Sequence, residues 1–232
     1  MIQVKNLIKN FENGTIITNV LRGVDLYIPK GQFVAIMGRS GAGKSTLMYQ
    51  MSLLDIPTEG TVLIDGIQTD ILTEQERTDF RLRKLGFIFQ DYALLPELTA
   101  VENVIIPLLM RGMSKIDAIE QAYNALDSVD LSHVRDHRSS QLSGGEQQRV
   151  SIARAVAPQP DILFADEPTA NLDSVSGDSV MRVLKKLHED GQTIVMVTHE
   201  PEYSIYAQRV IYLEDGRVVS DDIQTEKIPT VS

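Results

Sequence analysis

The N-terminal part of the chain, from Ile2 to Asp70, alternates between apolar and polar positions. In the run Val24-Asp25-Leu26-Tyr27-Ile28 every second side chain is apolar, which predicts a strand with one buried face. Asn13-Gly14 and Asp65-Gly66 are dipeptides that favour tight hairpin turns. We therefore expect an antiparallel β layer in this part of the chain.

Four other segments are apolar at nearly every position, as is typical of strands buried in a parallel sheet. They are Phe33 to Met37, Leu85 to Phe89, Asp161 to Ala165, and Thr193 to Thr198. Between the last two segments, an apolar stripe at helical spacing consists of Val180, Val183, Leu184 and Leu187. Strand, helix and strand in this order favour an α/β fold.

A helical pattern fills the segment from Asp91 to Ala157. Thr99 and Glu102 have the spacing of a capping box, which marks the start of a helix. Apolar side chains then recur three or four residues apart, at Ile116, Ile119, Ala122, Leu126 and Val129. This segment is therefore interpreted as a helical insertion between the strands.

The composition limits the classes of function. A formal charge of −10 over 232 residues argues against a broad nucleic-acid surface and against direct attraction to anionic lipid. No cysteine is present, which excludes disulfides and thiolate catalysis and suits the cytoplasm. We expect no signal peptide at Met1 to Phe11 and no membrane span, since Pro107 interrupts the short apolar run from Val104 to Met110.

The first candidate for chemistry follows the apolar run that ends at Met37. It fits the pattern G-x-x-x-x-G-K-[ST] and comprises Gly38, Arg39, Ser40, Gly41, Ala42, Gly43, Lys44, Ser45 and Thr46. The glycines let successive N–H groups converge on phosphates, and the following helix adds its positive end. We expect Lys44 to reach the β- and γ-phosphates of a nucleotide and the Ser45 hydroxyl to bind Mg²⁺.

An acidic pair, Asp166 and Glu167, directly follows another apolar run. At the carboxyl end of a buried parallel strand, such side chains face the edge of the sheet that binds ligands. We expect Asp166 to hold Mg²⁺, largely through water, and Glu167 to be the general base that deprotonates the attacking water. An acidic pair after a strand is otherwise a solvated turn, so this interpretation depends on the neighbouring phosphate loop.

Two further polar residues end apolar runs. His199 is expected to contact the γ-phosphate, the alternative being a half-exposed histidine packed at a strand end. Gln90 is expected to bind Mg²⁺ and the attacking water through its amide, although a glutamine at a strand end has no distinctive meaning alone.

A second glycine-rich turn, Leu142-Ser143-Gly144-Gly145-Glu146, opens a helical stretch. The structural alternative is a capping box made by Ser143 and Glu146. Gly144 and Gly145 favour close approach of backbone N–H groups to an anion. Because the first loop already surrounds the γ-phosphate of the nucleotide that it binds from one side, we expect this turn to contact the nucleotide bound by a second copy.

Together these residues resemble the nucleotide-binding subunits of ATP-binding cassette (ABC) transporters over nearly the whole chain. The similar segments occur in the family's order: Walker A at Gly38 to Thr46, Q-loop at Gln90, signature at Leu142 to Glu146, Walker B at Ile162 to Asp166, D-loop at Asn171 to Asp173, and switch histidine at His199. The resemblance implies an ATPase that uses ATP and Mg²⁺. It also implies that two copies close head to tail, so that Ser143 and Gly145 act in trans.

The fold implied by this resemblance is α/β: a P-loop NTPase (RecA-like) core with an antiparallel β subdomain and an inserted α-helical subdomain. We expect a single domain over residues 1–232. The β subdomain and core occupy 1–90 and 158–220, and the helical subdomain occupies 91–157. A hairpin at Leu213 to Val219 closes the domain, and residues 221–232 form a flexible tail.

Two positions depart from the family's commoner pattern. Phe11 stands where a tyrosine usually stacks on adenine, and stacking needs only an aromatic face. The alternative for Phe11 is a side chain packed in the β layer. Ser140 stands where close relatives often have proline, which loosens the loop without changing the chemistry.

Within the family, the residues from Phe87 to Gln90 and from Leu94 to Thr99 most resemble the lipoprotein-release, macrolide-export and cell-division group. The resemblance implies a subunit that powers a separate membrane permease, exporting or extracting a lipid-like, lipoprotein or hydrophobic substrate. The alternative is a non-transport ATPase that drives a membrane-bound mechanical complex of the cell-division type. The permease is expected to dock near Asp91 to Leu98 and to hold the chain at the cytoplasmic face of the membrane; the alternative is an ordinary loop rich in buried leucines.

Two rival classes fit the sequence less well. Cassette ATPases of DNA repair carry long insertions between the two phosphate motifs, and this chain has no insertion of that length. A regulatory module that no longer hydrolyses ATP does not need the general base and the switch histidine, which are intact at Glu167 and His199.

Overall fold

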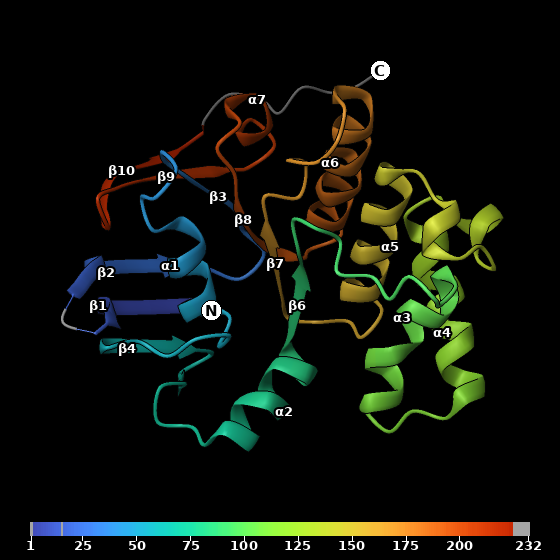
Figure 1. The fold of residues 1–232 in the computed structure, drawn as a ribbon, viewed down its shortest axis with the longest axis horizontal. Coiled ribbons are helices and arrows are strands. Elements are labelled where there is room, and N and C mark those ends of the chain that lie inside the picture. Colours follow the sequence, from blue (N-terminus) through green and yellow to red (C-terminus); the bar gives the residue numbers. More distant parts are fainter. Residues whose placement is uncertain (1, 15, 225–232) are drawn as a thin grey trace. The chain divides into compact units, whose positions relative to one another are not determined.

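The computed structural model describes residues 2–14 and 16–224, and the chain divides into two compact units. Unit 1 comprises Met1–Thr78 and Gly191–Ser232, and unit 2 comprises Asp79–Asp190. Each unit has its own strands and helices, which Figure 1 labels in chain order. The segment expected to be the helical subdomain, 91–157, lies wholly within unit 2.

Unit 1 contains the antiparallel β layer that the alternating pattern predicts. Its strands are β1 (Ile2–Asn13), β2 (Ile16–Ile28), β4 (Glu59–Ile64) and β5 (Ile67–Gln68), in the order β2-β1-β4-β5. Every pairing is antiparallel. In β2 the side chains of Val24, Leu26 and Ile28 are buried whereas Asp25 and Tyr27 are exposed, so one face of the layer packs into the core.

The second set of strands in unit 1 surrounds the fully buried strand β3 (Phe33–Met37). Strands β8 (Thr193–Val197) and β9 (Arg209–Glu214) flank β3 and run parallel to it, while β10 (Arg217–Ile223) returns antiparallel to β9. Helix α1 (Lys44–Met51) follows β3, and the short helix α7 (Pro201–Ser204) follows β8. The predicted buried parallel strands at β3 and β8 are confirmed.

The closing hairpin extends further than the sequence predicts. Residues 221–223 were expected in the tail, but they continue β10 and pair with Ile211, Val210 and Arg209. The Arg209 guanidinium donates two hydrogen bonds to the Asp221 carboxylate, at 2.5 and 2.6 Å, which holds this end of the strand in place. The rest of the expected tail, 225–232, lies outside the described residues.

In unit 2, two parallel strands lie next to a group of helices. The strands are β6 (Leu85–Ile88) and β7 (Ile162–Asp166); the helices are α3 (Ala100–Met110), α4 (Lys115–Ser128), α5 (Gly144–Val156) and α6 (Ser174–Glu189), with short 3₁₀ turns at Ser132–Val134 and Ser139–Gln141. Helix α5 packs against α3, α4, α6 and β6 and is the central helix of this unit (Figure 1). The predicted helical insertion is therefore confirmed, including the Thr99 capping box.

One residue of the predicted apolar stripes is not buried, so the prediction is wrong at that position. Ile116 is 80% exposed, whereas Ala122, Leu126 and Val129 are buried as expected. Ile116 lies in the first turn of α4, and the buried face begins at Ala118.

Helix α2 (Glu74–Lys84) is not among the predicted elements, and it includes the boundary between the two units. A capping box opens it: the Thr73 backbone N–H donates to a Glu76 carboxylate oxygen at 2.8 Å, and the Glu76 N–H donates to the Thr73 hydroxyl at 3.3 Å. No residue of α2 is fully buried, so an apolar stripe does not reveal this helix in the sequence.

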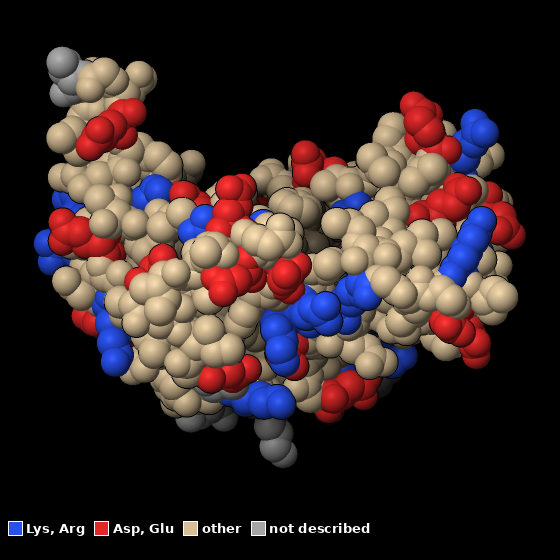
Figure 2. Space-filling model, turned by 90° about the horizontal axis from the view of Figure 1, so that it is seen from below, with Lys and Arg blue, Asp and Glu red and all other residues tan. Residues whose placement is uncertain are grey.

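The surface carries charges of both signs. On the face that Figure 2 shows, Lys and Arg side chains lie interspersed among Asp and Glu side chains. Within residues 2–14 and 16–224, no helix combines the length and the apolar character that crossing a bilayer requires.

Candidate functional site

The predicted phosphate loop lies in unit 1, between the end of β3 and the start of α1. Gly38, Gly41 and Gly43 have φ values of 147°, 80° and 98°, which L-residues with a side chain rarely adopt. Helix α1 has no side-chain cap, and its first turn contains no acidic residue. The positive end of this helix is therefore not covered by a capping side chain, which suits an anion.

Two of these glycines are also required by close contacts. A Cβ at Gly38 would lie 2.1 Å from the carbonyl oxygen of Leu213, and a Cβ at Gly43 would lie 3.1 Å from that of Val20. The loop is thus packed against β9 and β2.

Lys44 is the first residue of α1 and is buried, with 6% of its surface exposed. Its ammonium group donates a hydrogen bond of 3.1 Å to the carbonyl oxygen of Arg39, across the loop. A lysine side chain held back over the loop places its charge next to the backbone N–H groups. Arg39, Ser40 and Gly41 are exposed, while Ser45 and Thr46 are partly buried.

His199 lies at the same edge of the strands as the phosphate loop. Strands β3 and β8 run parallel with Ile36 opposite Val197, and Gly38 and His199 each lie two residues beyond that pair. The Thr198 N–H donates to the Ile36 carbonyl at 3.2 Å, so the pairing continues toward the edge. His199 is exposed, which agrees with the position expected for it but leaves its role a prediction.

Phe11, the candidate for adenine stacking, is 47% exposed on β1. It pairs with Thr18 of β2, near Val20, which contacts the phosphate loop. The ammonium group of Lys9 lies 5.0 Å from the centre of the Phe11 ring. The ring is therefore not packed inside the β layer, and it is open to a stacking partner.

The other predicted site residues lie in unit 2, where β6 and β7 end. These parallel strands place Ile88 opposite Ala165, and Gln90 and Glu167 each lie two residues beyond that pair. Asp166, the last residue of β7, is buried. Gln90 is exposed and Glu167 is partly buried, so an amide and two carboxylates meet at one edge of these strands.

Glu167 has a strained backbone, because its φ is 44°. A left-handed conformation at a residue with a side chain costs about 1–3 kcal/mol and persists only where surrounding contacts impose it. Such strain is typical of functional positions. The sequence gives no sign of this conformation.

Three further residues support this edge; Gln148 and Arg154 were not identified from the sequence, and Asn171 was expected only as part of the D-loop. Buried Gln148 on α5 donates to the carbonyls of Phe89, at 3.3 Å, and Pro168, at 2.8 Å, so it joins the segments that follow β6 and β7. Asn171 donates to the Gln90 carbonyl at 3.0 Å. Arg154 donates to the carbonyls of Tyr92 and Ala93. These contacts join residues far apart in the sequence, so no local motif reveals them.

The predicted signature turn forms the start of α5, and the structure contains the capping box. The Ser143 N–H and hydroxyl donate to a Glu146 carboxylate oxygen at 2.8 and 2.7 Å, and the Glu146 N–H donates to the Ser143 hydroxyl at 3.4 Å. The hydrogen bonds from the Ser143 hydroxyl and N–H lower the pKa of Glu146 below its usual value. His133 lies 3.7 Å from the same carboxylate.

The two glycines of the signature turn also have a packing reason. A Cβ at Gly144 would lie 3.0 Å from the Tyr92 hydroxyl, and a Cβ at Gly145 would lie 3.0 Å from the Cβ of Ser176. The presence of two glycines therefore does not by itself distinguish an anion site from a capped helix, which corrects the argument made from the sequence. The trans role of the turn stays a prediction.

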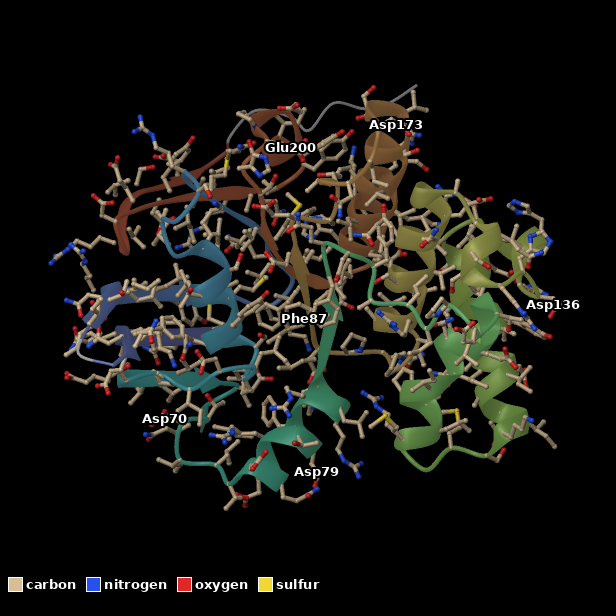
Figure 3. The ribbon with its side chains drawn as sticks, viewed as in Figure 1. Asp70, Asp79, Phe87, Asp136, Asp173 and Glu200 are labelled. Carbon is tan, nitrogen blue, oxygen red and sulfur yellow. The ribbon has the colours of Figure 1, made fainter. Side chains whose placement is uncertain are left out.

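Asp173, in the expected D-loop, caps helix α6. It accepts hydrogen bonds from the N–H and hydroxyl of Ser176, at 3.0 and 2.8 Å, and these lower its pKa. Figure 3 labels Asp173 at this end of α6 and Phe87 on β6. The D-loop and the signature turn thus share Ser176 as a neighbour.

The expected docking segment, Asp91 to Leu98, is an ordered loop with apolar exposure. Leu95 is 50% exposed, although its N–H donates to the buried Asn103 side chain at 2.8 Å. Leu94 and Leu98 are partly buried. The alternative of a loop rich in buried leucines does not describe this segment, and the docking role stays a prediction.

The oxygen donors expected for Mg²⁺ are the Ser45 hydroxyl in unit 1 and the Gln90 amide and Asp166 carboxylate in unit 2. Oxygen donors suit Mg²⁺, which also keeps several water or phosphate ligands. Within the described residues, no group of three or more His, Cys, Asp or Glu side chains could hold a metal alone. That these donors hold one metal stays a prediction.

Comparisons with known proteins agree with this geometry. A family model described as ABC transporter matches residues 21–170. LolD from Aquifex aeolicus, the ATP-binding protein of a lipoprotein-releasing system, is 47% identical over 94% of each chain. An uncharacterized ABC transporter ATP-binding protein from Methanocaldococcus jannaschii is 45% identical over 96% of this chain and 97% of its own. MacB from Aggregatibacter actinomycetemcomitans, a macrolide export ATP-binding/permease protein, is 47% identical over 95% of this chain, which spans about a third (34%) of MacB.

A solved structure is also similar over nearly the whole chain. It is a dimer of the Methanocaldococcus jannaschii cassette in a post-hydrolysis state bound to ADP and Pi. Its TM-score is 0.89 at 45% identity, and the match covers 96% of this chain and 98% of that one. The likeness confirms the predicted α/β fold of a P-loop NTPase.

Proposed function

The chain belongs to the ABC transporter family of ATP-binding proteins, and from this premise we propose that its ATPase activity drives a separate membrane permease. Its activity is the hydrolysis of ATP with Mg²⁺. The observation that carries the ATPase part of the proposal is the uncapped start of α1, beside the glycine loop and the buried Lys44, a combination that suits a bound anion.

In the proposed site, the phosphate loop binds ATP, and the polar residues predicted at the strand ends complete the chemistry. The loop N–H groups and Lys44 hold the β- and γ-phosphates, and Phe11 stacks on adenine. Water attacks the γ-phosphorus, Glu167 accepts the proton of that water, and the bond to the ADP oxygen breaks. Gln90 and His199 orient the water and the γ-phosphate.

The metal in this proposal is held by Ser45, Gln90 and Asp166. When bound, Mg²⁺ neutralises charge that develops on the phosphate oxygens. The buried carboxylate of Asp166 and the strained backbone of Glu167 keep these two acidic groups at fixed and different positions.

The proposal includes a head-to-tail dimer of two copies. In it, Ser143 and Gly145 of each copy contact the γ-phosphate bound by the other copy, and Asp173 lies near the same interface. The relative from Methanocaldococcus jannaschii was solved as a dimer bound to ADP and Pi, which supports this arrangement. The capping box must then exchange hydrogen bonds when the partner's ATP arrives.

The permease is proposed to dock on the loop from Asp91 to Leu98, where Leu95 is exposed. This contact would place the chain at the cytoplasmic face of the membrane. The relatives named for lipoprotein release and macrolide export support a lipid-like, lipoprotein or hydrophobic cargo. A second candidate function is to drive a membrane-bound mechanical complex of the cell-division type, in which no cargo crosses.

The substitution Glu167→Gln tests the catalytic part of the proposal. Because Glu167 acts as a base and not as a binding group, turnover should fall by roughly 10²- to 10⁴-fold while ATP still binds. The variant should accumulate as an ATP-bound dimer, measured by light scattering after gel filtration. Glu120→Gln, at an exposed position on α4, is the matched control and should hydrolyse ATP like the wild type.

Two results would contradict this function. Full hydrolysis by Glu167→Gln would remove the assigned base. In a second experiment, Glu167→Gln is trapped with ATP in solubilised membranes, and recovery of no protein with several membrane spans would argue against a permease partner. The identity of any protein that is recovered would distinguish transport from the mechanical alternative.

A further inference from the structure

The backbone that follows β6 is held at four of its carbonyl groups by side chains from elsewhere in unit 2. We call residues 89–93 the Q-segment. The carbonyl of Phe89 accepts from Gln148 at 3.3 Å, and that of Gln90 accepts from Asn171 at 3.0 Å. The carbonyls of Tyr92 and Ala93 both accept from Arg154. This is an unusual density of side-chain contacts for an exposed loop.

Arg154 makes the most demanding of these contacts. One nitrogen of its guanidinium donates to the Ala93 carbonyl at 2.5 Å, and another donates to the Tyr92 carbonyl at 2.9 Å. Burial lowers the pKa of this guanidinium from its usual value. The group nevertheless stays charged, because arginine does not lose its proton in proteins. A partly buried cation with two backbone partners holds their positions relative to each other.

The two carbonyls belong to residues in a strained conformation. Tyr92 and Ala93 have φ values of 62° and 50°, and neither is a glycine. A left-handed residue with a Cβ is unfavourable, and two in succession are more so. The fork of Arg154 binds both carbonyls in this conformation, so the two hydrogen bonds offset part of the strain.

We infer that Arg154 is a positioning residue for ATP hydrolysis, because it fixes the turn directly after Gln90 and so sets where the Gln90 amide lies. The inference rests on the proposed function for the role of Gln90. Arg154 also lies on the helix that begins at the signature turn, eleven residues or about 16 Å after Ser143. A shift of α5 therefore moves the signature turn and the Q-segment together.

The test compares two arginines on the same helix. Arg154→Lys keeps the charge, but an ammonium group cannot reproduce the planar fork that binds both carbonyls. Arg149→Lys is the control, because the Arg149 guanidinium donates to the Ser179 hydroxyl at 3.1 Å, and Ser179 lies outside the Q-segment. We expect Arg154→Lys to lower kcat about tenfold or more with KM for ATP changed less than about twofold, and Arg149→Lys to change neither by more than about twofold.

Amide hydrogen exchange separates positioning from general stability. In Arg154→Lys, amides of residues 89–98 should exchange at least about tenfold faster, while those of β7 and α6 keep their rates. Ala93→Gly added to Arg154→Lys should restore about fivefold of the lost kcat, because glycine adopts the left-handed conformation without strain. A merely structural role for Arg154 would not produce this rescue.

Three outcomes would overturn the inference. They are unchanged kcat and exchange in Arg154→Lys, equal losses in Arg149→Lys, and failure of both Arg154→Lys and the double variant to fold. A wild-type chain that does not hydrolyse ATP would instead overturn the proposed function, and the exchange experiment would still report whether Arg154 holds the Q-segment.

Discussion

Two helices of this protein begin at glycine-rich turns, but their first turns differ. Helix α1 begins after Gly43 with no side-chain cap and no acidic residue in its first turn. Helix α5 begins after Ser143 with a complete capping box, in which Glu146 accepts from Ser143. Both turns were predicted to hold phosphate, yet a side-chain cap is present only at the second.

The difference indicates how each turn can bind an anion. At α1 the loop is shaped by contacts with Val20 and Leu213, so binding needs little rearrangement. At α5 an incoming phosphate meets the Glu146 carboxylate, which repels it and competes for the Ser143 hydroxyl. The turn at α5 is therefore suited to a phosphate that another copy already holds, and less suited to capturing one alone.

The largest expected effect comes from removing the cation of the first turn. Lys44→Ala should weaken ATP binding by about 100-fold or more, because the buried ammonium is the charge nearest to the phosphates. Binding of a fluorescent ATP analogue measures this change. Lys5→Ala, at an exposed lysine of β1, should bind ATP like the wild type. Equal affinity for Lys44→Ala and the wild type would show that the first turn is not the binding loop.

The second prediction asks whether the turn at α5 acts in trans. Ser143→Arg should abolish hydrolysis, because a large cation replaces the hydroxyl at the shared site. Mixing Ser143→Arg with Lys44→Ala creates dimers in which one site combines both defects and the other site is intact. The equal mixture should therefore recover about a quarter of wild-type activity under single-turnover conditions, although each variant alone is inactive. No recovery in the mixture would contradict a shared site.

Three glycine-to-alanine substitutions compare how much each turn depends on glycine for the stability of the protein. Gly38→Ala combines a positive φ with a Cβ only 2.1 Å from a backbone carbonyl, and it should destabilise the protein by about 2–3 kcal/mol. Gly41→Ala has the positive φ but no atom within 4 Å, and it should cost about 1 kcal/mol. In Gly144→Ala the new Cβ meets the Tyr92 hydroxyl at 3.0 Å and the Leu172 Cδ2 at 3.3 Å, both at the ends of flexible side chains, and stability should change by less than about 1 kcal/mol. Urea unfolding measures all three, and equal losses would refute the proposed difference.

The sequence predicted the parts of the site that depend on local pattern. Continuous apolar runs identified β3 and β8 in unit 1 and β6 and β7 in unit 2, and within each unit the parallel pairing places the residues that follow both strands at the same edge. The positions of His199 and Gln90 at strand ends follow from this pattern, and their roles stay predictions. The phosphate loop followed from its glycine spacing, which the observed φ values explain.

The remaining features depend on contacts between distant residues. Arg154 and the Q-segment are about sixty residues apart, since the two hydrogen bonds span 61 and 62 positions. The positive φ of Glu167 results from surrounding packing, so a glutamate at that position gives no warning of it. The close approach of Gly144 to Tyr92 is also a contact between distant residues. It gives Gly144 a packing role, so the two glycines alone do not identify an anion site.

The smallest expected effect concerns the carboxylate of the second turn. Hydrogen bonds from the Ser143 hydroxyl and N–H lower the pKa of Glu146, so its contribution to stability is present above its usual value of 4.5 and is lost as the pH falls through the folded value. Between about pH 6 and pH 3 the wild type should therefore lose up to about 1 kcal/mol more than Glu146→Gln, in which this position does not titrate. His133, at 3.7 Å and exposed, adds little when it is protonated. Urea unfolding at each pH measures the difference, with Glu120→Gln as a control that should follow the wild type. If Glu146→Gln and the wild type lose stability in parallel, the capping carboxylate does not stabilise α5, and the contrast between the two helix starts no longer holds.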